Sequence, residues 1–249
     1  MQRFLSILLV FLCPALLAQR NIEKKVTVSS SQSLSLEFDY PELIKVYAGT
    51  TNELVIKGKV SINRGENDEA FELKQEQSGS VIRIISGLRD RDKLPKRLVL
   101  KKGDQEYYFK TDNYNSPEVQ KFLEENGSEY TYMNNGIIMD IELEVYLPKG
   151  VSTTIDAKYG MVEVLSCDAP LTVVARYGGV DATISAKAFS GVNAKTRFGE
   201  ILTNLPEKPS TSEFGKGHDN WTVVSYSFGG RYSLDLESKY GKVYLRKSQ

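Results

Sequence analysis

The chain has 249 residues, and its 32 lysines and arginines are balanced by 32 aspartates and glutamates. That balance argues against a nucleic-acid partner, because proteins that bind nucleic acids carry an excess of basic side chains that displaces counterions from phosphates. His218 is the only histidine, and no phosphate-binding loop, dinucleotide fingerprint or calcium loop occurs. We therefore expect neither a cofactor nor a metal.

Residues 1–18 have the composition of a secretory signal peptide. Arg3 gives a positive start, residues 4–17 are mostly apolar, and Ala18 is a small residue at the expected cleavage point. The apolar run is short for a transmembrane helix, and no second run follows. Cys13 lies inside the run rather than at its end, so lipid attachment is not expected. The sequence predicts export, and a mature chain from Gln19 with a net charge of −1 and no transmembrane segment.

Residues 19–88 alternate between apolar and polar positions in short runs, which predicts a β-rich segment. Residues 89–135 open on a charged run and break this pattern, so we interpret them as an insertion. Within it, residues 116–126 predict a short helix, with Ser116 as the N-cap and Gly127 just past the end. Residues 136–249 return to strand alternation, and we expect 19–249 to form one continuous domain.

The C-terminal segment contains a repeat in which an aromatic residue stands between a basic residue and a glycine. The aromatic residues lie 18, 21 and 42 positions apart, and a period near 20 is typical of stacked supersecondary units. With the aromatic residue as position 0, positions −4 and +3 are apolar and position −2 is small. The four units are Lys158-Tyr159-Gly160, Arg176-Tyr177-Gly178, Arg197-Phe198-Gly199 and Lys239-Tyr240-Gly241.

This spacing predicts an all-β fold with a β-solenoid or β-helix-like stack of short strands in the C-terminal half. Positions −4, −2 and 0 should face inward, with the small residue at −2 leaving room for the ring and the glycine at +1 allowing a bend or a close backbone approach. A meander of hairpins is the alternative. The residues expected to point largely inward are Ile155, Ala157, Tyr159, Val162, Val173, Ala175, Tyr177, Val180, Phe198, Ile201 and Tyr240.

The 42-residue interval interrupts the pattern. Pro206, Pro209 and the glycine-rich run 214–220 predict a long loop. After it, two strand-like segments flank Phe228–Arg231, which predicts a hairpin.

The chain also resembles a known family. The turn at 147–150, the strand-Gly-strand units such as 155–164, and the exported β-rich leader together resemble the DUF4097 putative-adhesin family of bacterial cell envelopes. The resemblance covers about residues 25–249, with 89–135 as an insertion. It implies an adhesin-like envelope protein and supplies no functional residues that could be transferred to this chain.

The leading functional hypothesis is a non-enzymatic envelope protein, periplasmic or displayed at the cell surface, that binds through a long β face. The basic residues at position −1 would form a positive stripe on the outward face, suited to an envelope protein or an anionic surface polymer. The same residues also keep such a face soluble and discourage edge pairing. The candidate binding residues are Lys158, Arg176, Arg197 and Lys239.

The alternative hypothesis is a carbohydrate-active enzyme built on a parallel β-helix. Its candidate carboxylates are Glu163 and Asp181, both four positions after an aromatic residue. At the equivalent positions of the later units, Leu202 and Tyr244 interrupt the acidic row. Cys167, the one cysteine of the predicted mature chain, is interpreted as a small buried residue rather than a reactive thiol.

The signal peptide leads to a direct prediction. Protein recovered after expression in a bacterial host should begin at Gln19, because cleavage follows a small residue at the end of the apolar run. Intact mass spectrometry measures this. A mass that includes Met1, or one that includes lipid on Cys13, would overturn the prediction.

Overall fold

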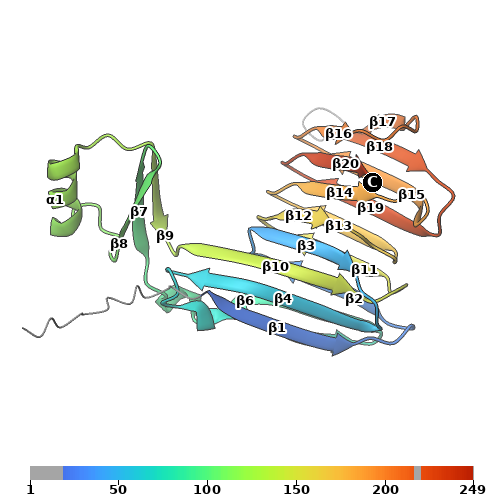
Figure 1. The fold of residues 1–249 in the computed structure, drawn as a ribbon, viewed down its shortest axis with the longest axis horizontal. Coiled ribbons are helices and arrows are strands. Elements are labelled where there is room, and N and C mark those ends of the chain that lie inside the picture. The colour runs from blue at the N-terminus through green and yellow to red at the C-terminus, as the bar shows by residue number, and fades with distance from the viewer. Residues whose placement is uncertain (1–18, 216–219, 249) are drawn as a thin grey trace, which may run out of the picture.

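The computed structural model describes residues 19–215 and 220–248. The predicted signal peptide and His218 lie outside these residues. In the described part, two large β-sheets face each other, and a small third sheet with one α-helix lies to one side (Figure 1). The described chain is therefore mostly β, as its alternating sequence predicts.

Sheet A has eight strands. Their bounds are β1 Arg20–Thr27, β3 Leu43–Ala48, β4 Glu53–Ile62, β10 Met139–Leu147, β12 Met161–Val164, β14 Val180–Ile184, β16 Ile201–Thr203 and β20 Val243–Lys247. They lie in the order β1-β4-β10-β3-β12-β14-β20-β16.

Sheet B has nine strands. Their bounds are β2 Ser33–Phe38, β5 Phe71–Ser78, β6 Val81–Leu88, β11 Thr153–Ala157, β13 Leu171–Ala175, β15 Phe189–Thr196, β17 Ser210–Phe214, β18 Trp221–Ser227 and β19 Tyr232–Ser238. They lie in the order β17-β18-β15-β19-β13-β11-β2-β6-β5.

Ten of these strands form five rungs in the described part of the chain. Each rung consists of one sheet B strand, a corner and one sheet A strand, and neighbouring rungs pair in parallel in both sheets. Equivalent residues of successive rungs therefore lie beside one another, about 4.8 Å apart. In spatial order the rungs are β2–β3, β11–β12, β13–β14, β19–β20 and β15–β16.

Additional strands extend the stack at both ends. Beyond the β2–β3 rung, β10, β4 and β1 continue sheet A, while β6 and β5 continue sheet B. Beyond β15, β18 and β17 continue sheet B in antiparallel pairing. The edge strands β1 and β5 are rich in charged side chains, which discourages pairing with other chains.

The repeat extends further than the sequence indicates. In sheet B, Ala157 lies opposite Phe38, so the β2–β3 rung has Asp39 at position −1, Tyr40 at position 0 and Pro41 at +1. The proline in place of glycine conceals this first rung, which lies in the segment predicted only as β-rich.

The 42-residue interval marks neighbouring rungs rather than a gap in the stack. Thr196 of β15 lies opposite Ser238 of β19, and β19 also pairs with β13. The β19–β20 rung is thus inserted between two rungs that precede it in the sequence.

The predicted loop at 206–220 contains β17, which pairs with β18. The hairpin predicted at Phe228–Arg231 is wrong, because β15 lies between β18 and β19.

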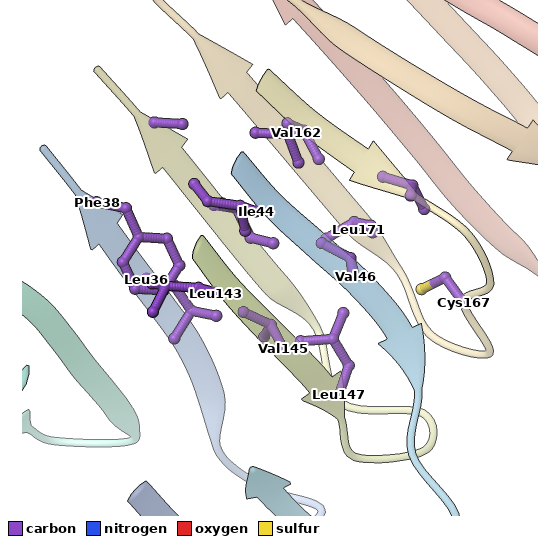
Figure 2. Packing of buried hydrophobic residues seen from close by; sticks show 14 of the residues in the cluster. Leu36, Phe38, Ile44, Val46, Leu143, Val145, Leu147, Val162, Cys167 and Leu171 are labelled. Carbon is purple, nitrogen blue, oxygen red and sulfur yellow. The ribbon is translucent and has the colours of Figure 1, made fainter. Parts of the chain in front are cut away.

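The facing sides of sheets A and B enclose one hydrophobic core, part of which Figure 2 shows around Phe38, Ile44 and Leu143. Positions −4 and −2 of the four predicted units are fully buried, and so is position +3 in three of them, which confirms that part of the predicted register. Ile201 is partly buried and packs against this core. The residues concerned are Ile155, Ala157, Val162, Val173, Ala175, Val180, Ala194, Thr196, Leu236, Ser238 and Val243.

Glycine at the rung corners is required by close approach of the backbones. A Cβ atom added to Gly178 would lie 1.9 Å from the carbonyl oxygen of Gly160, and one added to Gly199 would lie 1.8 Å from that of Gly241. The corner glycines do not have positive φ, so their backbone conformation would allow other residues. Crowding between the rungs is what excludes a larger side chain.

The insertion forms a separate small layer. Sheet C contains β7 (Arg97–Lys102), β8 (Gln105–Phe109) and β9 (Tyr132–Gly136), and helix α1 (Pro117–Asn126) packs on it through Leu98, Leu100, Phe109 and Val119. Ser116 caps α1, accepting a hydrogen bond from Val119 N at 3.4 Å, and Gly127 ends the helix with φ of 80°. The predicted helix is confirmed.

The insertion is tied to the loop after β4. The buried Asn63 side chain donates to Pro95 O at 2.9 Å and accepts from Ile138 N at 3.1 Å, so it joins both ends of the inserted segment. Arg97 also forms an ion pair of 2.7 Å with Glu66. Two short 3₁₀ helices, Asp68–Ala70 and Arg91–Lys93, flank this joint.

The corner geometry gives a stability prediction. Replacing Gly178 by alanine should lower the free energy of unfolding by about 1–3 kcal/mol or more, because the new methyl group overlaps the Gly160 carbonyl. Chemical denaturation measures the effect. Gly229→Ala is the control, since no heavy atom lies within 4 Å of its Cβ position. Equal stability of the two variants would contradict the close packing of the corners.

Candidate functional site: a ridge at the rung corners

The aromatic residues of the repeat face solvent, and the prediction that they point inward is wrong. Their exposed fractions are 56% for Tyr159, 57% for Tyr177, 52% for Phe198 and 45% for Tyr240. Each sheet B strand ends at position −2, where the last inward side chain lies. The chain turns after that residue, so the period of two no longer applies at position 0. The small residue at −2 accommodates the corner and not the ring.

The four rings form one stacked row along the rung corners. Adjacent ring centroids are 5.4 Å apart for Tyr159 and Tyr177, 5.2 Å for Tyr177 and Tyr240, and 5.1 Å for Tyr240 and Phe198. The interplanar angles are 17°, 3° and 12°. The parallel register of the rungs produces this row, because it brings equivalent side chains beside one another.

The four predicted basic residues accompany the rings. In spatial order they are adjacent, since the register places position −1 of each rung beside that of the next. The Lys158 ammonium lies 5.2 Å from the Tyr159 centroid, that of Lys239 5.4 Å from Tyr240, and the Arg197 guanidinium carbon 4.7 Å from Phe198. We call these eight residues the corner ridge: Lys158, Tyr159, Arg176, Tyr177, Lys239, Tyr240, Arg197 and Phe198.

Arg176 and Lys158 lie beside carboxylates of the protein itself. Arg176 forms a two-contact pair with Asp156, at 3.1 and 2.6 Å, and this carboxylate raises the pKa of Arg176. Lys158 lies 3.8 Å from Asp39, the position −1 residue of the first rung. These two contacts partly neutralise the half of the ridge nearer the β2–β3 rung.

Buried hydroxyl groups fix the corner under the second half of the ridge. Ser238 Oγ accepts from Gly241 N at 2.9 Å and donates to Gly178 O, at 2.8 Å, in the neighbouring rung. Thr196 Oγ1 accepts from Gly199 N at 3.1 Å and donates to Gly241 O at 3.2 Å. These hydroxyls link successive corners, so the ring row has a rigid support. The sequence identifies position −2 as small, but it does not predict that the hydroxyl groups there bond to the neighbouring corner.

Stacking determines which parts of the rings a ligand could reach. Tyr177 and Tyr240 each have a ring on both faces, so only their edges and hydroxyl groups remain open. Aromatic edges carry partial positive charge, and phenol hydroxyls are hydrogen-bond donors. Together with the four cations, the corner ridge favours ligands rich in acceptor oxygens and negative charge over sugar faces that stack on a ring.

The candidate carboxylates of the enzymatic alternative lie on the outward face of sheet A. Glu163 and Asp181 are opposite each other on β12 and β14, as their shared position predicts. Asp181 is engaged by Arg246 through contacts of 2.6–2.8 Å, and this hydrogen bonding raises the pKa of Arg246. Tyr244 and Leu202 continue the same row.

Other features of the described residues offer less chemistry. A surface hollow of about 490 Å³ on sheet A is lined by three lysines and three glutamates, so its charges balance: Lys45, Lys57, Lys59, Glu23, Glu142 and Glu144. Among residues 19–215 and 220–248, no group of three or more His, Cys, Asp or Glu side chains is placed to hold a metal ion. Cys167 is buried, as expected, and burial raises its pKa to about 11.

No family model matches the chain, and no curated protein matches it, so membership in DUF4097 stays a prediction. Solved structures with partial similarity include a putative cell adhesion protein from Clostridium sporogenes, with 12% identity, coverage of 92% of this chain and 100% of that chain, and a TM-score of 0.44. A putative adhesin from Bacteroides fragilis has 11% identity, coverage of 93% and 98%, and a TM-score of 0.27. No helix of the described residues is long and apolar enough to cross a membrane.

The exposure of the rings gives a prediction that separates surface from core. Within one rung, Tyr159→Ala should cost about 0.5–1.5 kcal/mol, the value of one aromatic stacking contact. Ile155→Ala should cost about 2–5 kcal/mol, because Ile155 is fully buried. Denaturant unfolding of both variants measures the difference. A greater loss for Tyr159→Ala would place the ring in the core.

Proposed function

We propose that this protein is an exported, non-enzymatic, adhesin-like protein of the cell envelope. Its five rungs are interpreted as a short β-solenoid in one continuous domain, 19–249, into which residues 89–135 are inserted. The corner ridge is the proposed binding surface, and Lys158, Arg176, Arg197 and Lys239 are the proposed contact residues. The mature protein is proposed to act in the periplasm or at the cell surface.

The observation that carries the proposal is the continuity of the corner ridge. Four rungs at a spacing of about 4.8 Å give a strip of about 14 Å, along which ring edges and cations repeat at one interval and three of the four rings carry a hydroxyl group. An extended anionic polymer with regularly spaced acidic groups, lying along the stack axis, fits such a strip. Several weak contacts at fixed spacing add up along one chain.

A non-enzymatic role is supported by the contacts of Asp181, one of the two candidate carboxylates. Asp181 forms an ion pair with Arg246. The next two residues in the same row across sheet A are Tyr244 and Leu202, which are not acidic. Acid–base chemistry on a glycosidic bond needs two carboxyl groups available to the substrate. No observation on the described residues favours the carbohydrate-active alternative.

The ligand class leads to a binding prediction. Binding to an acidic polysaccharide such as polygalacturonate, or to lipopolysaccharide, should weaken steeply between low and physiological salt, because exposed charges are screened beyond about 8–10 Å. The double variant Lys239→Glu/Arg197→Glu should reduce binding at low salt about tenfold or more. Each exposed ionic contact is worth about 0.2–1 kcal/mol, and reversal replaces attraction by repulsion.

The control has the same change in net charge away from the ridge. Lys93→Glu/Lys121→Glu alters two side chains that are 80% and 74% exposed in the insertion. It should bind like the wild type, and a neutral polysaccharide should not bind. Binding that is independent of salt, equal loss in both double variants, or no binding by the wild type would overturn the proposal.

A further inference from the structure

Three consecutive members of the ring row are tyrosines, and their hydroxyl groups are not required for stacking. Phe198 occupies the same position in the last rung and stacks on Tyr240 at 5.1 Å, comparable to the tyrosine pairs. Each ring of Tyr159, Tyr177 and Tyr240 is about half exposed. The phenol groups are therefore available for chemistry that phenylalanine could not perform.

The backbone holds these tyrosines one strand spacing apart. Tyr177 N donates to Lys158 O at 2.9 Å, and Tyr240 N donates to Arg176 O at 3.2 Å, so inter-rung hydrogen bonds continue through the corner. The centroid separations of 5.4 and 5.2 Å follow from this register. Two reactive groups fixed in this way meet at a high effective concentration.

We propose that Tyr177 is a site of oxidative cross-linking, joined through a dityrosine bond to Tyr159 or Tyr240. A one-electron oxidant of the haem-peroxidase class, with hydrogen peroxide, removes one electron and one proton from each phenol. The two phenoxyl radicals form a carbon–carbon bond between their ortho positions, and each ring then loses its ortho proton to the phenol oxygen. One hydrogen peroxide is reduced to two waters, and the protein loses two hydrogen atoms.

The exposure of the rings permits the movement that this bond requires. The new bond lies in the plane of both rings, so the cofacial pair must tilt out of the stack. Side chains that are 45–57% exposed have room to do so, and the ring row faces solvent along its length.

A second stacked tyrosine pair provides a comparison within the same molecule. Tyr47 and Tyr146 have centroids 5.0 Å apart and an interplanar angle of 15°. Both are only partly exposed, and the Tyr146 hydroxyl donates to Glu144 Oε2 at 2.9 Å. This pair tests whether stacking alone is enough for a dityrosine bond to form, or whether the rings must also be exposed to solvent.

The bond would join rungs that are distant in the sequence. A Tyr177–Tyr240 link closes a loop that contains the β15–β16 rung and the added strands β17 and β18. Cross-links across long loops restrict the unfolded chain most. The inference does not depend on the proposed ligand; the proposed export determines only where the oxidant would be met.

The experiment treats dilute mature protein with horseradish peroxidase and hydrogen peroxide. The monomer should lose the mass of two hydrogen atoms and gain the blue fluorescence of dityrosine, and peptide mapping should join Tyr177 to Tyr159 or Tyr240. Tyr177→Phe should abolish most of the fluorescence of the monomer while keeping the wild-type melting temperature, as Phe198 already shows that phenylalanine fits the row. Tyr146→Phe should retain the fluorescence.

The opposite results overturn the inference. They are unchanged fluorescence in Tyr177→Phe, cross-links that map only to other tyrosines, cross-links found only between molecules, or no dityrosine in the wild type. Polysaccharide binding is measured separately, so failure of this inference and failure of the proposed function are distinguishable.

Discussion

Close contact between the backbones of neighbouring rung corners underlies the architecture of the stack. At the corners the carbonyl oxygen of one glycine lies where a Cβ atom on the glycine of the neighbouring rung would have to be. The inter-rung hydrogen bonds continue through the turn because nothing separates the chains there. Sheets A and B therefore stay in register around the corner, and every equivalent side chain lies beside its counterpart. The buried core, the ring row and the row of cations are three results of that one contact.

The inward side of the fold could be predicted from the sequence to a large extent. Ile155, Ala157 and Val162 follow the alternation of a half-buried strand. Such alternation is a local property of the sequence, so it can be recognised without knowledge of the tertiary structure. The helix at 117–126 was likewise readable from Ser116 and Gly127, because capping depends on a few adjacent residues.

The outward direction of the rings was not predictable in the same way. Whether Tyr159 continues the pleat or leaves it depends on where β11 ends, and strand ends are set by contacts with other rungs. The order of rungs is a second limit. The spacing of the units in the sequence indicates that they stack in sequence order. The pairing of Thr196 with Ser238 instead depends on contacts between β15 and β19, which the spacing does not specify. The candidate cations were adjacent as predicted, but their ion pairs with Asp156 and Asp39 come from positions outside the recognised motif.

The interleaved order of rungs has a consequence for how the stack is assembled. As the chain is synthesised, the β15–β16 rung emerges before the β19–β20 rung. In the stack, however, β19–β20 lies between β13–β14 and β15–β16. In the folded protein β13–β14 and β15–β16 are not paired with each other in either sheet, because residues 232–247 lie between them. The native stack therefore needs β19–β20 to pair on both sides with strands that precede it in the sequence. Folding that could otherwise proceed one rung at a time from the N-terminus must wait at this step, which makes it a candidate for the slowest stage of assembly.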